Sequence, residues 1–282
     1  MRTKTRIAAL IAASALALAG CSSNDEKSDS GEGDGGANGD GITIGVKFDQ
    51  PGLGLKDGSE FKGFDIDVAK YLAKELGYEE DQITFVESVS AQRENMLENG
   101  QADLIVATYS ITDERKERVS FAGPYFVAGQ GLLVAEGEAD ISGPDSLDGK
   151  TLCSVSGSTP AQRIKDEHSE GVQLQEAQGY SECVELLSSG AVDAVTTDDI
   201  ILAGFAAQDK YAGKLKLVGK PFSEELYGVG VAKGSDMCEQ VNEALTKMID
   251  DGTWEKAVKD NLGDAYTPNP DTNPPAPGGN CG

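Results

Sequence analysis

Short apolar runs alternate with segments of helical periodicity along most of this 282-residue chain. The apolar runs are rich in β-branched residues, which favour strands, and several amphipathic segments end at glycine, which favours helix termination. In the first half, the pattern predicts alternating strands and helices at 42–46, 65–76, 83–86, 91–99 and 103–108. The second half predicts a similar alternation, and then a strand and two helices, at 151–155, from 159 onward, 172–175, 181–189, 193–197, 227–232, 237–250 and 253–261. Such alternation is typical of an α/β fold.

The two halves also match at individual positions. Residues 97–103 (Leu-Glu-Asn-Gly-Gln-Ala-Asp) align without gaps with residues 187–193 (Leu-Ser-Ser-Gly-Ala-Val-Asp). Continuing this register places Thr108 opposite Asp198. Because open α/β sheets bind ligands at the carboxyl ends of their strands, these positions predict two lobes facing each other across a cleft. A repeat of helix, glycine and strand is also compatible with ordinary α/β packing without a shared site.

The N-terminus carries the pattern of an export signal. Three basic residues lie within 2–6, and the apolar run at 7–19 is too short to span a bilayer. The run ends in Leu-Ala-Gly-Cys, which matches a bacterial lipobox. It predicts cleavage of a signal peptide, 1–20, and lipid on Cys21. The alternative is an ordinary secretory signal with an incidental cysteine.

Composition divides the rest of the chain into a body and two flanking segments. Residues 21–41 are almost all Ser, Gly, Asp, Glu and Asn, which predicts a flexible acidic tether because such a segment buries little apolar surface. Residues 264–282 contain five prolines and predict an extended tail without a core. The body between them, 42–263, is long enough for one large or two small domains.

The charge balance excludes several classes of function. With 48 acidic and 24 basic residues, the chain has a formal net charge of −24, which argues against nucleic acid and against a basic membrane-binding patch. The single histidine, His168, lies in a charged run, and no metal-ligand spacing is present. We therefore expect no metal, no cofactor and no histidine-based catalysis. An anion would need a local concentration of cations.

The cysteines fit an oxidising, extracytoplasmic environment. Beside Cys21 there are four, which allow three connectivities. The favoured pairs are Cys153–Cys183, which would join a strand to a helix, and Cys238–Cys281, which would attach the tail to a terminal helix. Free buried thiols are the alternative.

The segment 107–125 carries the most informative motif. It places the hydroxyls of Thr108 and Ser110 after an apolar strand, and Arg115 in the helical start that follows. A guanidinium binds a small carboxylate through two parallel hydrogen bonds. The alternative is a capped helix with Arg115 in a surface salt bridge. The pattern resembles the family 3 solute-binding proteins, the extracytoplasmic amino-acid receptors of ABC transporters.

The resemblance covers nearly all of 42–263 and implies a fold. That fold is the two-lobed, periplasmic-binding-protein-like type II fold, with two α/β lobes joined by a two-strand hinge that allows closure around a ligand. Lobe 1 would comprise 42–125 and 227–263, and lobe 2 would comprise 126–226. The chain would cross between lobes near 126–130 and 223–226.

The resemblance also implies roles for individual residues. Arg115 would bind the α-carboxylate of an amino acid and Asp198 its α-ammonium, with Thr108 and Ser110 adding hydrogen bonds. A zwitterion in a partly dry cleft needs both charges paired. Ser158 and Thr159, at a predicted helix start, would supply backbone amides to the carboxylate, although many relatives have Thr in place of Ser158. Asp198 could instead cap the helix that follows it.

Two further cations point to the ligand's side chain. Lys47 at the end of the first strand and Arg93 at a helix start resemble the aspartate- and glutamate-binding members, in which such cations contact the side-chain carboxylate. Gln50 is a candidate hydrogen-bond donor to the same group, and Tyr227 a candidate phenol in the cleft. The alternatives are a solvated Lys47, an Arg93 paired with an acid of its own helix, and a Tyr227 that only packs.

These observations together predict a monomeric, lipid-anchored binding protein on the extracytoplasmic face of a bacterial cell membrane. It would capture L-glutamate, or L-aspartate, and deliver it to the membrane subunits of an ABC permease. One rival reading keeps the fold and binds glutamine, asparagine or another polar amino acid. A second is a dehydratase-type enzyme on the same fold, and a third is a sensor domain, for which no signalling segment is evident.

Overall fold

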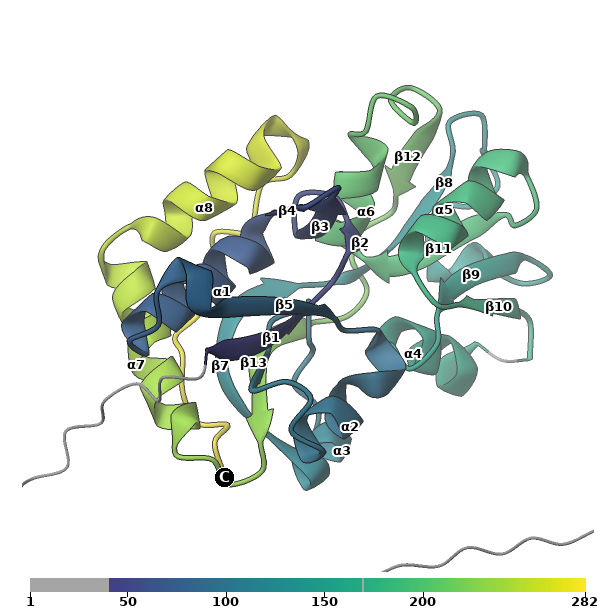
Figure 1. Ribbon diagram of the computed structural model, residues 1–282. Helices are drawn as coiled ribbons and strands as arrows, with labels where there is room; N and C mark the ends of the chain where they lie inside the picture. The colour runs from purple at the N-terminus through teal and green to yellow at the C-terminus, as the bar shows by residue number, and fades with distance from the viewer. Residues whose placement is uncertain (1–40, 169) are drawn as a thin grey trace, which may run out of the picture. The chain divides into compact units, whose positions relative to one another are not determined.

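The structure is a computed structural model that describes residues 41–168 and 170–282 (Figure 1). The expected signal peptide, 1–20, the lipidation site Cys21 and the tether 21–41, except for Gly41, lie outside the described residues. The described part contains two five-stranded sheets and one small three-stranded sheet.

The first large sheet has the strand order β5-β1-β6-β13-β7. Strand β1 pairs in parallel with β5 and with the central strand β6, whereas β13 runs antiparallel to β6 and β7. We call this sheet and its helices lobe 1. Its elements are β1 (Ile42–Val46), α1 (Phe64–Glu75), β5 (Ile83–Glu87), α2 (Arg93–Glu98), β6 (Leu104–Ile105), α3 (Asp113–Arg118), β7 (Val119–Ala128), β13 (Glu225–Ala232), α7 (Met237–Asp250) and α8 (Thr253–Leu262).

The second large sheet has the order β10-β9-β11-β8-β12. Here β9 is parallel to β10 and β11, and β8 is antiparallel to β11 and β12. We call this sheet and its helices lobe 2. Its elements are β8 (Gln130–Ala135), β9 (Thr151–Val155), α4 (Thr159–Glu167), β10 (Gln173–Ala177), α5 (Tyr180–Ser189), β11 (Ala194–Asp198), α6 (Asp199–Ala206) and β12 (Leu215–Val218).

Two adjacent segments join the lobes. β7 of lobe 1 leads through Gly129 into β8 of lobe 2, and the chain returns into β13. The returning segment pairs with the outgoing one, since Glu225 lies opposite Ala128 and Tyr227 opposite Phe126. The predicted α/β class, with two lobes joined by a two-strand hinge, is confirmed.

Some elements differ from the sequence expectation. The strand expected at 103–108 is shorter, Leu104–Ile105, because the chain turns at Thr108, which has a left-handed φ of 47°. The helix expected at 91–99 begins as a 3-10 turn, Ser90–Gln92, before α2. The small sheet of β2 (Asp49–Gln50), β3 (Gly54–Asp57) and β4 (Glu60–Lys62) was not predicted.

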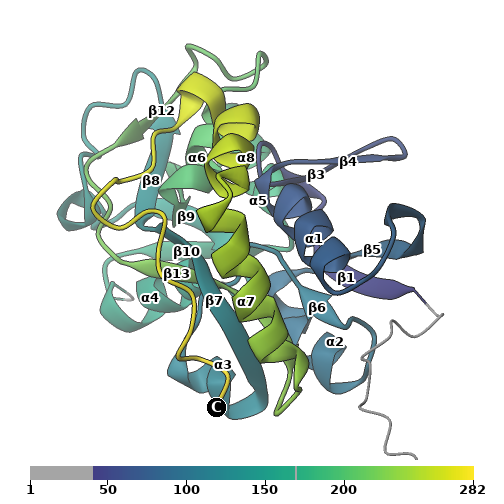
Figure 2. The same cartoon turned by 90° about the vertical axis from the view of Figure 1, so that its left-hand side faces the viewer.

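The C-terminal tail is extended but packs against the body. It runs beside β7 in Figure 2. Phe121 N–H donates to Asn280 O at 3.1 Å, and the Asn273 side chain bonds both backbone groups of Val127 at 2.9 Å. The tail is joined to α7 by a disulfide between Cys238 and Cys281, and a second disulfide joins β9 to α5 through Cys153 and Cys183. The pairing is the one that the sequence favoured.

Candidate functional site

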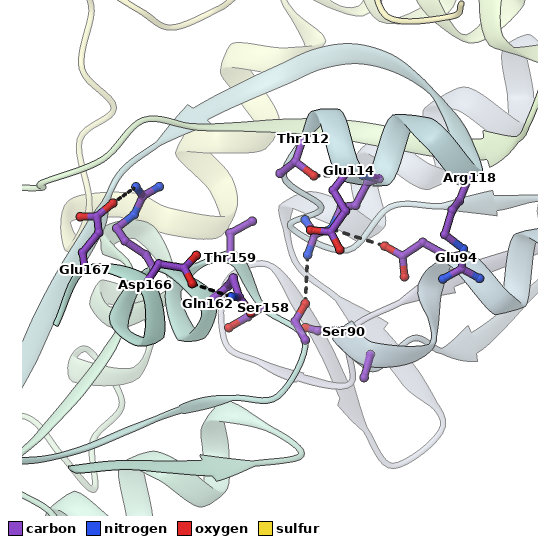
Figure 3. Close-up of a pocket in the computed structure, with 14 residues that line it drawn as sticks. Ser90, Glu94, Thr112, Glu114, Arg118, Ser158, Thr159, Gln162, Asp166 and Glu167 are labelled. Carbon is purple, nitrogen blue, oxygen red and sulfur yellow. Dashed lines mark hydrogen bonds and ion pairs between the residues drawn. The ribbon is translucent and has the colours of Figure 1, made fainter. Parts of the chain in front are cut away.

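A cleft of about 450 Å³ opens between the two lobes (Figure 3). One wall comes from α2, α3 and the turn before α3, with Glu94, Thr112 and Arg118. The other comes from the start and exposed face of α4, with Thr159 and Gln162. The cleft leads to a smaller inner cavity that shares Ser90, Arg115, Ser158 and Thr159 with it.

The inner cavity encloses about 10 Å³ and is lined from both lobes. A space of this size holds about one water molecule. Most of its lining residues are polar, and two carry guanidinium groups: Ser90, Arg93, Thr108, Ser110, Arg115, Ser158, Thr159, Pro160, Tyr180 and Ile201. Entry of an amino acid therefore requires the lobes to separate.

Arg115 links the two lobes across this cavity. Its Nη1 donates to Ser110 O of lobe 1 at 2.7 Å, and its Nη2 donates to Gly157 O of lobe 2 at 3.0 Å. Its Nε lies 3.4 Å from a carboxylate oxygen of Glu94. Arg115 is 9% exposed, so it does not form the surface salt bridge that was the alternative prediction. Its neighbour Arg118 does form such a salt bridge, with Glu98.

Arg93 is a buried cation beside Arg115. Its guanidinium lies 5.0 Å from the ring centre of Tyr109, and the guanidinium of Arg115 lies 4.9 Å from the same ring. Such contacts over an aromatic face partly compensate a cation's lost hydration. Burial and the charge of Arg115 lower the pKa of Arg93. Within 41–168 and 170–282, Arg93 Nε has no hydrogen-bond partner and no carboxylate lies within ion-pair distance of this residue.

Lys47 and Gln50 lie on the lobe 1 side and are also buried. Lys47 Nζ pairs with Asp49 at 3.3 Å, and burial lowers the pKa of the lysine, partly opposed by Asp49. The alternative of a solvated Lys47 is therefore wrong, since it is 1% exposed. The amide oxygen of Gln50, Oε1, lies 3.3 Å from the hydroxyl oxygen of Thr108, as an acceptor. Neither Lys47 nor Gln50 lines the small inner cavity.

Asp49 also joins the lobes. Its carboxylate accepts hydrogen bonds from the backbone N–H of Ser181 at 3.2 Å and from the Ser181 hydroxyl at 3.3 Å. Ser181 lies in the first turn of α5, where a negative charge is favoured by the helix dipole.

Asp198 and Tyr227 form a buried pair between lobe 2 and the hinge. The Tyr227 hydroxyl donates to Asp198 Oδ2 at 2.5 Å, while Asp198 Oδ1 has no partner among the described residues. Asp198 precedes α6 at the N-cap position, but its side chain makes no capping hydrogen bond. Burial, and then the charge of Glu225, raise the pKa of Asp198 well above its usual range.

The start of α4 supplies the lobe 2 wall. Ser158 is the N-cap, and its hydroxyl accepts from Ala161 N–H at 3.1 Å. The Thr159 hydroxyl donates to Glu225 at 2.8 Å and lies 3.2 Å from the Ser110 hydroxyl. Glu225 is 3% exposed and also pairs with Arg163 at 3.1 Å.

The structure thus brings most of the predicted residues to one interlobe region, with Lys47, Gln50, Asp198 and Tyr227 outside the inner cavity lining. Sequence reasoning missed Ser90, Tyr109, Tyr180, Ile201 and Glu225. Tyr109 lies between Thr108 and Ser110 in the predicted motif, so its position was a usable signal. The other four follow from the tertiary structure and had no local signal.

The described residues contain no group of three or more potential metal ligands that could hold an ion. No helix in the part of the chain that the structure describes is both long and apolar enough to cross a membrane.

Comparison with known families gives one match that covers the body. Residues 42–264 match the bacterial extracellular solute-binding proteins, family 3.

Similar curated proteins include two with named amino-acid ligands. The glutamate-binding protein GluB of Corynebacterium glutamicum is 44% identical over 281 residues, covering 93% of this chain and 92% of that protein. The ABC transporter glutamine-binding protein GlnH of Bacillus subtilis is 43% identical over 223 residues, covering 78% of this chain and 80% of that protein.

Solved structures with the same fold include an ancestral arginine-binding protein bound to arginine. It has a TM-score of 0.74 and 35% identity, and the match covers 79% of this chain and 99% of that one. The GluR0 ligand-binding core from Nostoc punctiforme, in complex with L-glutamate, has a TM-score of 0.70 and 27% identity, covering 78% and 99%.

Proposed function

Because the chain belongs to family 3 of the bacterial extracellular solute-binding proteins, we propose that it binds L-glutamate between its lobes. L-Aspartate is the second acidic candidate. The bound amino acid would pass to the membrane subunits of an ABC importer. The protein would act as a monomer.

The buried, unpaired guanidinium of Arg93 carries the choice of an acidic ligand. A buried cation without a counter-ion is costly, and an anion from the ligand would offset that cost. Arg93 is 3% exposed and next to a second guanidinium, that of Arg115. Lys47 adds a third buried cation, and burial together with the positive charge of Arg93 lowers the pKa of this lysine. This concentration of cations in a chain of net charge −24 favours a dicarboxylic amino acid.

The remaining site groups suit the α-carbon end of the ligand. Arg115 would bind the α-carboxylate bidentately after exchanging its bonds to Ser110 O and Gly157 O for the ligand's oxygens. The backbone N–H of Thr159 would bind the same carboxylate at the positive end of α4, whereas the N–H of Ser158 already donates to Val155 O at 3.1 Å. Asp198 Oδ1, buried and without a partner among the described residues, would accept from the α-ammonium group. Thr108 and Ser110 would complete the hydrogen bonds.

Glutamine, a neutral amino acid, is the second candidate ligand beside the acidic ones, and one observation favours it. Lys47 is already paired with Asp49, so the local positive charge is smaller than three cations imply. A neutral side-chain amide could bind Gln50 and Lys47 without adding a negative charge. The similarity to the glutamine-binding protein of Bacillus subtilis supports this alternative.

Calorimetry on residues 41–282 tests the ligand and the two cation roles. We expect glutamate binding, and an Arg115→Gln variant should lose at least about thirtyfold in affinity for both glutamate and glutamine, because it removes a charged contact common to all amino acids. Arg93→Gln should weaken glutamate by a similar factor but affect glutamine little.

Lys116→Gln is the matched control for Arg115→Gln. It removes a positive charge from the same short helix, but Lys116 does not line the cleft and pairs with Asp113. Its affinity should equal that of the unsubstituted protein. Absence of glutamate binding, or binding insensitive to Arg115→Gln, would reject the proposal; stronger glutamine than glutamate binding would select the second candidate.

We also propose an anchored, non-enzymatic role on the extracytoplasmic side of the membrane. The lipobox at 18–21 supports lipid on Cys21, and Cys21→Ser protein retained in the membrane fraction would contradict it. The match to a family of solute-binding proteins supports binding without turnover. Release of a new product from a bound amino acid would revive the dehydratase alternative.

A further inference from the structure

Thr108 has a backbone conformation that its side chain disfavours. Its φ is 47°, and it is the one non-glycine residue with positive φ in the described part of the chain. A β-branched residue in this region is strained, and such strain persists only when the surroundings hold it in place. The residue is 6% exposed and lines the inner cavity.

A carboxylate on α1 holds this turn. Asp65 Oδ2 accepts the backbone N–H of Thr108 at 2.9 Å, and Asp65 Oδ1 accepts the hydroxyl of Tyr125 at 2.8 Å. Asp65 is fully buried, so both bonds form away from water. The Thr108 hydroxyl lies 2.7 Å from the carbonyl oxygen of Ala107, which satisfies it within the same turn.

The turn determines where the next two residues lie. Tyr109 places its ring beside the guanidinium groups of both Arg93 and Arg115, and its hydroxyl donates to Glu94 at 2.7 Å. Ser110 presents its carbonyl oxygen to Arg115. The conformation of Thr108 therefore sets the positions of groups that touch both arginines.

We propose that Asp65 is a positioning residue of the ligand site, which holds Thr108 in the left-handed conformation and thereby places Tyr109 and Ser110. The inference deepens the proposed function, since it concerns the same cleft. Asp65 acts through these residues and does not itself line the cavity. The role requires its ionised form, because a protonated carboxyl has one oxygen occupied by hydrogen and no longer accepts equally from two donors.

The titration of Asp65 supplies a distinctive readout. Burial raises its pKa to about 6, opposed by the hydrogen bonds from Tyr125 and Thr108 and by the charge of Arg93. Burial and then the charge of Asp65 raise the pKa of Tyr125, and the pKa of Tyr227 on β13 is raised by burial, by Asp198 and, more weakly, by Asp199 and Asp65. Between the unfolded and folded pKa values the folded state binds more protons, so this group's contribution to stability increases as the pH falls through 6. Ligand affinity should change in the opposite direction and decrease as the pH falls.

The test compares unsubstituted protein with Asp65→Asn by calorimetry with glutamate between pH 5.5 and 8. At pH 8 the Asp65→Asn variant should bind glutamate about tenfold more weakly than the unsubstituted protein. The ratio of these two glutamate affinities should approach one as the pH falls below 6, because Asp65 is then protonated in the unsubstituted protein. Titration of Asp198 and of glutamate itself occurs in both proteins and cancels in this ratio. Asp67→Asn is the matched control: the residue lies on the same helix and bonds Asn261 at 2.6 Å, and its substitution should leave the ratio at one.

A double-mutant cycle with Thr108→Gly tests the mechanism without any ligand. Glycine adopts positive φ without strain, so the loss of unfolding free energy on Asp65→Asn should be smaller when residue 108 is glycine. A ratio of affinities independent of pH, or additive effects in the cycle, would overturn the inference. If the unsubstituted protein binds no amino acid, the proposed function fails, and the cycle alone decides whether Asp65 holds the turn.

Discussion

Asp198 is a buried carboxylate, and burying a charge without full pairing costs free energy. It is 3% exposed and its Oδ1 has no partner among the described residues. Burial raises its pKa, so the folded state binds more protons than the unfolded state between the two pKa values. This group's contribution to stability is therefore largest below the unfolded pKa and falls as the pH rises through the folded pKa.

Asp198→Asn should for this reason stabilise the ligand-free protein while impairing its function. At pH 7.5 we expect the free energy of unfolding in urea to rise by about 0.5–2 kcal/mol, the range common for single stabilising substitutions. The gain should shrink as the pH is lowered. Glutamate affinity should fall at least about thirtyfold, because the α-ammonium loses its counter-ion.

Asp209→Asn controls for the loss of one negative charge from lobe 2, because Asp209 is exposed. It should change neither quantity. A destabilised Asp198→Asn protein at pH 7.5 would show that the carboxylate contributes favourably without ligand and would contradict this account.

Side-chain type and spacing predicted which cations lie in the interlobe region but not their contacts, and the roles of these cations towards a ligand stay predictions. Lys47, Arg93 and Arg115 were identified because cations at strand ends or helix starts stand out in an acidic chain. The sequence could not decide whether Arg93 pairs with an acid of its own helix; among the described residues Arg93 forms no ion pair and contacts the ring of Tyr109 instead. Asp65 resembled an ordinary acidic residue of a helix's first turn, and its bond to Thr108 spans 43 positions.

At the scale of elements, several segments with a clear apolar pattern were predicted at their observed bounds, whereas others, including β8 and β12, were not predicted. β1, β9 and α7 have the expected bounds, since each has a clear apolar pattern. β2 has two residues and β4 has three, too few to establish a period. The predicted strand at 103–108 was longer than β6, because the hydrophobic pattern does not show that the chain turns at Thr108.

The tail is an element whose attachment can be tested. Cys238 and Cys281 close a segment of 43 positions, and a disulfide of this kind stabilises by about 2–4 kcal/mol. Replacing both by Ser should reduce the free energy of unfolding by about that amount. It should also accelerate hydrogen exchange at the amides of Phe121 and Val127, which donate to Asn280 and Asn273 of the tail.

Replacing Cys153 and Cys183 by Ser provides the comparison. This variant loses a disulfide within lobe 2. It should be destabilised to a similar degree, but exchange at Phe121 and Val127 should remain slow under native conditions. Unchanged exchange at these two amides in the Cys238/Cys281 variant would mean that hydrogen bonds alone hold the tail.

At the scale of the whole molecule, the close approach of the lobes depends on glycine. Gly204 lies in α6 of lobe 2, and a Cβ built there would lie 2.2 Å from the carbonyl oxygen of Pro51 in lobe 1. Gly204→Ala should favour the helix itself by up to about 1 kcal/mol, because alanine has the higher helix propensity. It should oppose closure, and so weaken glutamate binding by about tenfold or more.

Small-angle X-ray scattering checks this directly. With saturating glutamate, Gly204→Ala should retain a larger radius of gyration than the unsubstituted protein. Gly137→Ala is the control, because a Cβ at that position meets nothing within 4 Å. Equal affinity and equal compaction in Gly204→Ala would show that the backbone near Pro51 yields without cost.

The path of the tail along β7 affects how readily the protein would aggregate through this strand. β7 is one of the two edge strands of its sheet and has ten residues, and exposed edges of this kind recruit strands from other molecules. Here the tail occupies the N–H of Phe121, the carbonyl oxygen of Gly123 and both backbone groups of Val127. A chain shortened before residue 264 would leave these groups open to edge-to-edge aggregation. The five prolines of the tail lack the N–H group that a further strand would pair with, so we expect the tail to disfavour edge-to-edge association.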